Sequence, residues 1–167
     1  MAEFLRIQVA GNAELQEYLA RAVRRIERPA ELMEALAARL EANIQERFDR
    51  KVDPTGAAWQ PLAESTVAKY AEEDKGRHQG TLLERTGQMR SSLTSAAGDD
   101  WAEVGMSRLT AGGEWSIPLL HETGTRRMPR RGIFLADPDA GTLGVEDQAT
   151  LTEEITAFLD DVFGGAT

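Results

Sequence analysis

The chain has 167 residues, which suits one domain over residues 1–167 with a buried core. It contains no cysteine, which excludes disulfides and thiolate metal sites, and it has neither a membrane-spanning apolar run nor a signal-peptide pattern. The net charge of −9 disfavours a dedicated nucleic-acid-binding surface, because an acidic protein repels phosphates.

The first third of the chain predicts a short strand and two helices. Alternating apolar residues over 3–9 are typical of a strand. Asn12 can cap a following helix, which is expected to end or kink at Pro29 because proline lacks an amide donor. A longer helix is predicted from 30 to about 51 and is expected to lie on the sheet. The apolar stripes of the two helices are Leu15, Leu19, Ala22, Val23 and Ile26, and then Leu32, Leu36, Leu40, Ile44 and Phe48.

The middle of the chain predicts turns, short helices and an exposed loop. Proline and glycine at 54 and 56 indicate a turn over residues 53–56, and a short helix is expected near 65–71. Residues 72–80 are charged and contain two glycines, which indicates an exposed loop that becomes ordered on assembly. Thr86 can cap a short helix that runs through Ser92.

Short strands follow, and then a final helix. Residues 93–97 and 101–106 flank a Gly-Asp-Asp turn and predict a hairpin. Residues 115–120 predict a third strand, which Pro118 restricts to an edge or a bulge. A C-terminal helix is expected over residues 151–163, with Thr150 and Glu153 at capping-box spacing. The fold class is therefore α+β: long N-terminal helices and a C-terminal helix packed on a small, mainly antiparallel sheet.

Catalytic motifs are scarce. The two histidines, His78 and His121, lie in different segments and lack the ligand spacing that a zinc site requires. A Gly-x-Ser-x-Gly elbow and the two glycine-rich phosphate loops are missing from the sequence. We therefore expect a protein without catalytic residues, metal or cofactor, and keep a small metal-dependent hydrolase as a remote alternative.

Positive and negative charge separate in the last third of the chain. Four arginines fall in a loop expected to be exposed, residues 124–132: Arg126, Arg127, Arg130 and Arg131. No lysine or arginine follows them, whereas eight acidic residues do. Three interpretations of the loop remain open: a solvated turn that balances local charge, a contact surface for an acidic partner, or a contact with nucleic-acid backbone.

Four residue blocks follow one another along the chain. The first runs from Phe48 through Asp53-Pro54-x-Gly56 and Trp59-x-Pro61-Leu62 to Thr66, and the second has Leu82 and Leu83 followed by Thr86-Gly87-x-Met89-x-x-Ser92-Leu93. The third is Val104-Gly105, and the fourth is His121-x-x-Gly124 followed by Pro129 and Phe134-Leu135. In this order the blocks resemble the phage virion morphogenesis family, which includes the tail-completion proteins of P2-like phages and the corresponding protein of Mu-like phages. The sequence departs from the family pattern at Thr123, where relatives tend to have an aromatic residue, and at residues 129–131. Residues 29–163 are expected to form the family core, and 1–28 an addition to it. The motif residues with expected structural roles are Gly56, Trp59, Pro61, Leu62, Thr86, Gly87, His121, Gly124, Pro129 and Phe134.

The resemblance implies a structural protein that completes the tail or joins it to the head, as a ring of identical copies, six by family resemblance. It implies a place in the tail or neck of the virion, assembly in the host cytoplasm, other tail or neck proteins as partners, and no role at membranes or in sequence-specific nucleic-acid binding. A capsid-assembly or head-completion factor of the same pathway is the alternative. In a head-to-tail ring, we expect the four arginines of one copy to face Asp160 and Asp161 of the next.

Overall fold

The structure is a computed structural model that describes residues 13–73 and 82–164. The strand expected over 3–9, the Asn12 cap and most of the loop expected over 72–80 lie outside the described residues. The elements, in chain order, are α1 (Ala13–Glu27), α2 (Ala30–Arg50), α3 (Glu64–Glu73), the 3₁₀ helix η1 (Arg90–Ser92), β1 (Leu93–Ala97), β2 (Ala102–Met106), α4 (Ile117–Thr123) and α5 (Val145–Gly164). This is an α+β fold, as the sequence indicates.

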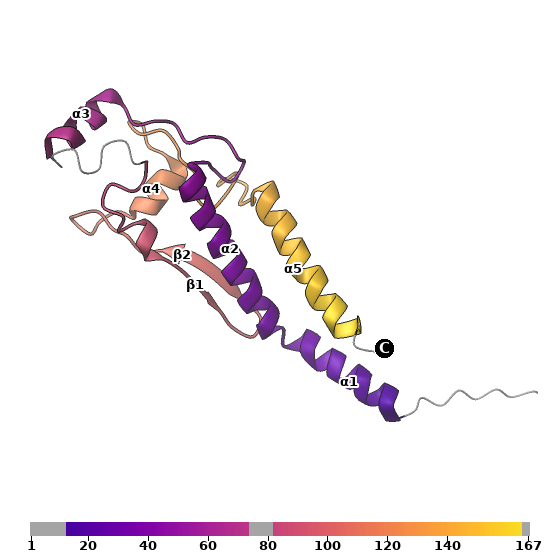
Figure 1. Ribbon diagram of the computed structural model, residues 1–167. Coiled ribbons are helices and arrows are strands. Elements are labelled where there is room, and N and C mark those ends of the chain that lie inside the picture. The colour runs from indigo at the N-terminus through magenta and orange to yellow at the C-terminus, as the bar shows by residue number, and fades with distance from the viewer. Residues whose placement is uncertain (1–12, 74–81, 165–167) are drawn as a thin grey trace, which may run out of the picture.

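Helix α2 forms the middle layer of the molecule. The β1–β2 hairpin lies on one side of α2 and α5 on the other, while α1 continues away from the start of α2 (Figure 1). The expected long helix is confirmed, and its stripe is most deeply buried at Ile44 and Phe48. Helix α2 ends at Arg50. The next residue, Lys51, adopts a left-handed conformation and its backbone N–H donates to the Arg47 carbonyl, which is a common way for a helix to end.

The predicted hairpin is confirmed. Strands β1 and β2 are antiparallel, with Leu93 opposite Met106 and Ala97 opposite Ala102, and the Gly98 amide closes the turn on the Trp101 carbonyl at 2.9 Å. Leu93, Val104 and Met106 pack against the core. Because a two-stranded hairpin is marginal alone, its stability depends on this packing against α2.

One buried cluster joins the layers. It consists of Ile44 and Phe48 from α2 with Trp59, Met89 and Ile133 from three loops. The rings of Phe48 and Trp59 meet edge to face, with centroids 5.3 Å apart. Most of the core partners of α2 therefore come from loops rather than from regular elements, so the loop conformations must be fixed by other means.

The third strand expected over 115–120 is wrong, because this segment begins helix α4. Ser116 caps the helix by accepting a hydrogen bond from the Leu119 amide at 3.4 Å. Pro118 fits in the first helical turn, where its missing amide would have had no partner inside the helix. Proline at an edge strand and proline at a helix start give the same local sequence signal.

Two expected helix starts are also wrong. Helix α5 begins at Val145, so Thr150 lies inside it and its hydroxyl donates to the Asp147 carbonyl at 3.1 Å instead of capping. The helix expected to begin at Thr86 is reduced to turns and η1, and the Thr86 hydroxyl accepts only a long, 3.5 Å hydrogen bond from the Gln88 amide. The short helix expected near 65–71 is present as α3.

Candidate functional site

Residues 130–135, here called the crossing segment, run through the centre of the molecule without regular secondary structure. The Glu122 side chain, which is only 5% exposed, holds this segment from α4. Its carboxylate accepts the amides of Ile133, Phe134 and Leu135 at 2.6, 2.9 and 3.0 Å. A carboxylate can accept several such bonds, so one side chain replaces the backbone partners that a strand would have supplied.

The two inner arginines of the predicted basic loop belong to this segment. Arg130 donates to the Glu122 carbonyl at 2.8 Å and to the Glu122 carboxylate at 3.2 Å. Arg131 is 4% exposed and donates to the carbonyls of Gln60 and Pro61 at 2.7 and 3.0 Å. Both guanidinium groups are thus engaged by their own chain.

The other two arginines remain on the surface. Arg126 and Arg127 are exposed at a turn in which the Thr125 hydroxyl accepts the amides of Arg127 and Met128 at 3.2 and 3.0 Å. Gly124 enters this turn with a φ of +72°, and a Cβ there would lie 2.9 Å from the Arg130 amide nitrogen. The structure therefore divides the predicted basic cluster into an inner and an outer pair, and a contact with a neighbouring copy now depends on the outer pair.

The two acidic candidates on α5 also differ. Asp160 is exposed, whereas Asp161 lies 2.8 Å from Arg25 of its own α1. That contact raises the pKa of Arg25, first through the hydrogen bond to Asp161. Asp161 therefore helps to hold α1 on α5, and Asp160 is the acidic candidate left for an intermolecular contact.

Family-motif residues from separate blocks converge on the crossing segment. The Trp59 indole donates to the Gly132 carbonyl at 2.9 Å, and the Arg131 amide donates to the His121 carbonyl at 2.8 Å. Pro61 supplies a carbonyl to the Arg131 side chain, and Phe134 packs against the core cluster. These contacts are structural, since each satisfies a polar group or fills the core. Gly56 and Gly87 take positive φ angles of +84° and +70° in turns, and Pro129 is exposed.

A cleft of about 300 Å³ lies beside this junction. Motif residues line it from three blocks: Leu62, Thr86, Gly87 and His121. Burial, and secondly the charge of Arg131, lowers the pKa of His121 to about 4, so its imidazole is neutral at pH 7. A group whose pKa lies this far below 7 is only a weak base at neutral pH. Within residues 13–73 and 82–164, no three side chains from histidine, cysteine, aspartate and glutamate are grouped to hold a metal ion.

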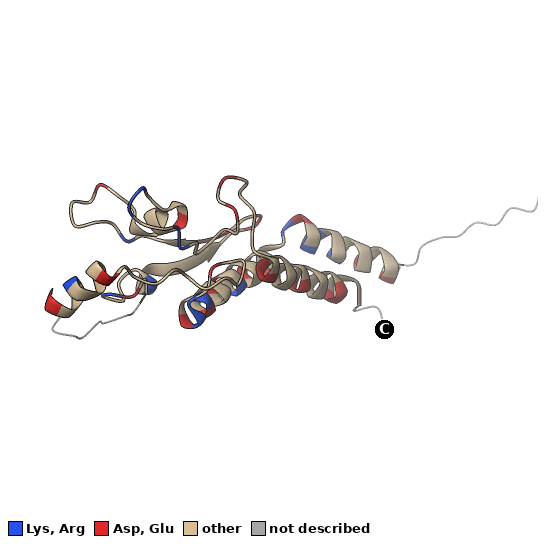
Figure 2. Ribbon diagram, turned by 90° about the horizontal axis from the view of Figure 1, so that it is seen from above, with Lys and Arg blue, Asp and Glu red and all other residues tan. Residues whose placement is uncertain are grey.

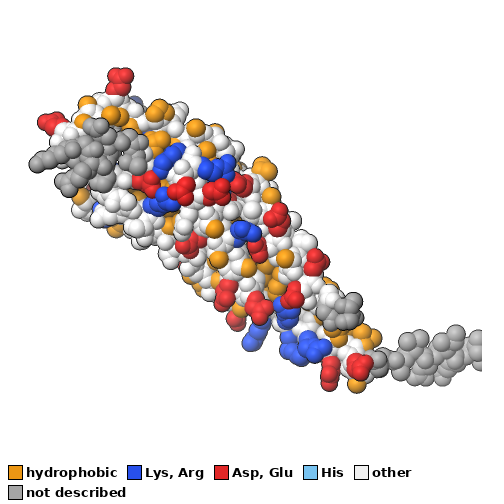
Figure 3. Space-filling view, in the orientation of Figure 1, with side chains coloured by type: hydrophobic (Ala, Val, Ile, Leu, Met, Phe, Trp, Pro, Cys, Tyr) orange, Lys and Arg blue, Asp and Glu red, His pale blue; other side chains and the backbone are white. Residues whose placement is uncertain are grey.

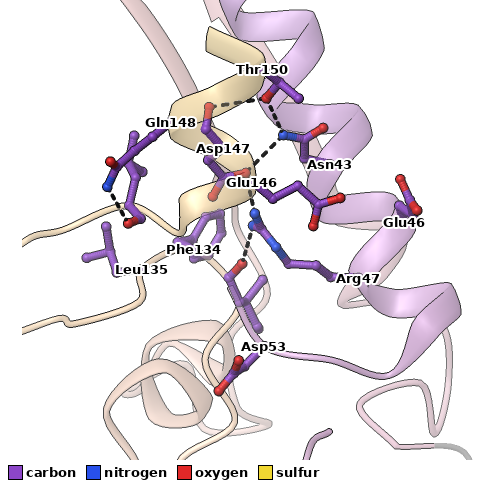
Figure 4. Close-up of polar contacts among 12 residues, drawn as sticks. Asn43, Glu46, Arg47, Asp53, Phe134, Leu135, Glu146, Asp147, Gln148 and Thr150 are labelled. Atoms are coloured by element: carbon purple, nitrogen blue, oxygen red, sulfur yellow. Dashed lines mark hydrogen bonds and ion pairs between the residues drawn. The ribbon is translucent and has the colours of Figure 1, made fainter. Parts of the chain in front are cut away.

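A buried ion pair fixes α5 on α2. Figure 4 shows Arg47 of α2 reaching Asp147 of α5, with Asn43 beside it. The Asn43 amide donates to Asp147 Oδ1 at 3.0 Å and to the Thr150 hydroxyl at 2.9 Å, and Arg47 also donates to the Ile133 carbonyl at 3.1 Å. The pair therefore connects α2, α5 and the crossing segment at one point.

Sequence reasoning missed Glu122, Arg47 and Asp147. Each is a charged residue in a chain where 28% of residues are charged, so composition did not distinguish them from surface residues. Arg47 lies one position before Phe48 at the edge of the apolar stripe, and that position beside the buried face was the available signal. For Glu122, the signal in the sequence was its position next to the family-motif residue His121.

Comparison with known proteins places the chain in a family. The model of the phage virion morphogenesis family matches residues 11–148, and the chain belongs to that family. The match takes in α1 and ends early in α5. The chain is therefore a phage assembly protein.

One curated relative is the putative capsid assembly protein G of Escherichia phage Mu. It is 31% identical to this chain over 77 residues. The match covers 46% of this chain and 48% of the relative, so the chain spans about half the length of that protein. No solved structure matches the chain significantly. None of the described helices is both long and apolar enough to cross a membrane.

Proposed function

We propose that this protein completes the tail of a phage virion or joins the tail to the head, and that it acts as a ring of identical copies together with other tail or neck proteins. The observation that carries the proposal is the family match over residues 11–148. Its action is assembly rather than catalysis, and its place is the tail or neck of the particle. The hydrogen bonds that hold the crossing segment and the buried Arg47–Asp147 pair suit a subunit that keeps one shape when it assembles.

The surface supports an assembly role in two ways. Figure 2 shows acidic positions along α5, whereas α1 carries both acidic and basic positions and further basic positions lie in the loops near α4. Several large apolar side chains are also exposed, among them Trp115 at 61% and Leu119 at 58%. Soluble monomers rarely expose such side chains together, and an assembling subunit covers them with its neighbours.

A second candidate is capsid assembly or head completion. The Mu relative, which is described as a putative capsid assembly protein, favours it. The two candidates place the same kind of subunit at different steps of particle formation. They differ in which half of the virion is defective when the protein is missing.

The experiment that separates them removes the protein from its phage. A phage without this gene is grown and the lysate is examined by electron microscopy. Tail completion predicts DNA-filled heads and separate tails of abnormal length or with unfinished ends. Head completion predicts normal tails and defective or empty heads. Mixing the lysate with the purified protein should restore infectious particles in either case, and normal virions without the protein would refute both proposals.

The ring is tested on the purified protein. Light scattering after size-exclusion chromatography should give a mass several times 18.3 kDa that falls on dilution. The mass should also fall as salt is raised, since ion pairs at the surface of the interface are screened. A monomer at every concentration and salt would contradict self-assembly of the free protein.

A further inference from the structure

The outer edge of strand β2 has no partner strand in the described part of the chain. The Gly98 amide bonds to the Trp101 carbonyl at 2.9 Å, and along an antiparallel ladder such bonded pairs alternate with open pairs. In this register, the backbone amides and carbonyls of Ala102, Val104 and Met106 point away from β1. None of these outward groups has a hydrogen-bond partner among the described residues, although all three residues are half-buried. This edge is therefore open to another strand.

A groove of about 250 Å³ runs along this edge, between β2 and α4. Val104, Gly105 and Met106 all line it. Because successive side chains of a strand point to opposite faces, the groove follows the edge of β2 rather than one face. Its other wall includes Pro118 and Leu119 of α4, and Leu119 is 58% exposed. We call this feature the β2-edge groove. It suits an added strand, because the free backbone groups can bind its backbone and the apolar walls its alternate side chains.

The sequence offers a strand that needs such a partner. The strand expected over residues 3–9, which lie outside the described residues, has Leu5, Ile7 and Val9 on one face. The backbone groups of a strand must be paired, so this segment requires an edge to bind. The family match begins only at residue 11, so the segment is a feature of this chain outside the matched region.

The segment cannot reach the groove of its own chain. Val9 lies within about 14 Å of Ala13, since four residues of extended chain span no more than that. Helix α1 continues away from the start of α2 in both ribbon views, and the space-filling view shows it at one end of an elongated molecule (Figure 3). The groove lies toward the other end, because Val104 packs on the cluster that contains Ile44. The lengths of α1 and of α2 up to Ile44 separate Ala13 from the groove by roughly 35–40 Å.

Contacts within the chain hold α1 in this direction. Tyr18 donates to the Phe163 carbonyl of α5 at 2.8 Å, and Arg25 lies 2.8 Å from Asp161. The start of α1 therefore stays far from the groove, and the segment before it is directed away from its own subunit. Each subunit thus has a strand that its own sheet cannot use and a sheet edge that its own strand cannot fill.

We propose that residues 3–9 of one copy pair with β2 of a second copy and place Leu5, Ile7 and Val9 along the β2-edge groove. Each copy then gives one strand and receives one, a head-to-tail exchange that can repeat around a ring. The inference rests on the proposed self-assembly and names the contact that produces it.

Cysteine crosslinking tests the contact on the full chain, because the native protein contains no cysteine. Ile7→Cys and Leu119→Cys are made in separate chains, and under mild oxidation their mixture should give a crosslinked dimer that neither variant gives alone. Ile155→Cys replaces Leu119→Cys in the control mixture, because Ile155 is 40% exposed on α5, across α2 from the hairpin. Equal crosslinking in the control would overturn the proposal. Dimers of Ile7→Cys with itself would also overturn it, since the N-terminal strands would then pair with each other.

A mixing experiment uses one defect on each side of the contact. Ile7→Pro removes a backbone donor from the strand, and Leu119→Glu places a charge in the groove. Each variant alone should be a monomer, with a circular dichroism spectrum that shows it is folded, whereas Ile7→Val should assemble like the wild type. The equimolar mixture of Ile7→Pro and Leu119→Glu retains one intact strand and one intact groove, so it should form dimers that grow no further.

A peptide separates this contact from self-assembly as such. A fluorescent peptide of residues 1–12 should bind the Ile7→Pro protein, and adding Leu119→Glu to that protein should weaken binding at least about tenfold, because the charge would be buried unpaired. If Ile7→Pro assembles as well as the wild type, self-assembly stands and this contact is wrong. If the wild type is monomeric but the peptide binds with the expected loss, the ring fails and the contact stands. A peptide that does not bind would overturn the contact.

Discussion

Replacing Glu122 by glutamine removes the charge from the centre of the crossing segment while keeping its size. The carboxylate accepts four hydrogen bonds: two amides at Oε2, and one amide with the Arg130 guanidinium at Oε1. Glutamine has one acceptor oxygen, so it can serve only one of these two sides. Its NH₂ group then faces donors on the other side, and two donors lose their acceptor.

The expected loss follows from those two bonds. Hydrogen bonds to a charged group contribute about 1.5–3 kcal/mol each, and a buried donor left without an acceptor costs about 1–3 kcal/mol. Because relaxation recovers part of this, we expect Glu122→Gln to lower the free energy of unfolding by about 3–5 kcal/mol. At about 2–4 °C per kcal/mol for a chain of this size, the melting temperature should fall by roughly 6–20 °C.

Urea denaturation followed by tryptophan fluorescence is a suitable assay, because Trp59 bonds to the crossing segment. Glu153→Gln on the exposed side of α5 is the matched control and should change stability by less than about 0.5 kcal/mol. A loss below about 1 kcal/mol for Glu122→Gln would refute the reasoning. It would mean that water or backbone movement satisfies the three amides without the carboxylate.

Three further changes test other parts of the structure. Ile44→Ala should lower the free energy of unfolding by about 2–5 kcal/mol in a urea titration, because Ile44 is 1% exposed in the core cluster. Gly144→Ala should lower the melting temperature, because a Cβ there would lie 2.0 Å from the Pro54 carbonyl oxygen; Gly105→Ala meets no atom within 4 Å and should have little effect. The pKa of His121 falls from 6.5 to about 4 on folding, so the unfolded chain protonates first as the pH falls. The stability that depends on the neutral imidazole should be lost between pH 6.5 and 4, on the order of 2–3 kcal/mol in denaturation experiments, and His121→Gln should remove that part of the pH dependence.

The sequence correctly predicted the helices and strands that depend on residues close together in the chain. Helix α2 follows from the four-residue spacing that ends at Ile44 and Phe48, and the hairpin follows from a Gly-Asp-Asp turn between two short apolar runs. The start of α5 could not be found this way, because its first turn buries Asp147 against Arg47. A buried ion pair between residues 100 positions apart leaves no periodic apolar signal in either segment.

The basic loop shows a second limit. The sequence shows four arginines within six residues, but it does not show the direction in which each side chain points. Arg131 points inward because the carbonyls of Gln60 and Pro61, some 70 residues earlier, are available to it. The four arginines therefore look alike in the sequence and differ in the fold, and only Arg126 and Arg127 keep the surface position that the pattern suggested.

The carboxylate that holds the crossing segment also gives that segment an unusual hydrogen-exchange behaviour. Loop amides usually exchange with solvent quickly, because small local openings expose them. The amides of Ile133, Phe134 and Leu135 belong to no helix or strand, yet all three donate to one buried acceptor that α4 carries. None of them can open without disturbing the other two, so their exchange should proceed through global unfolding and be as slow as that of amides in the buried turns of α2.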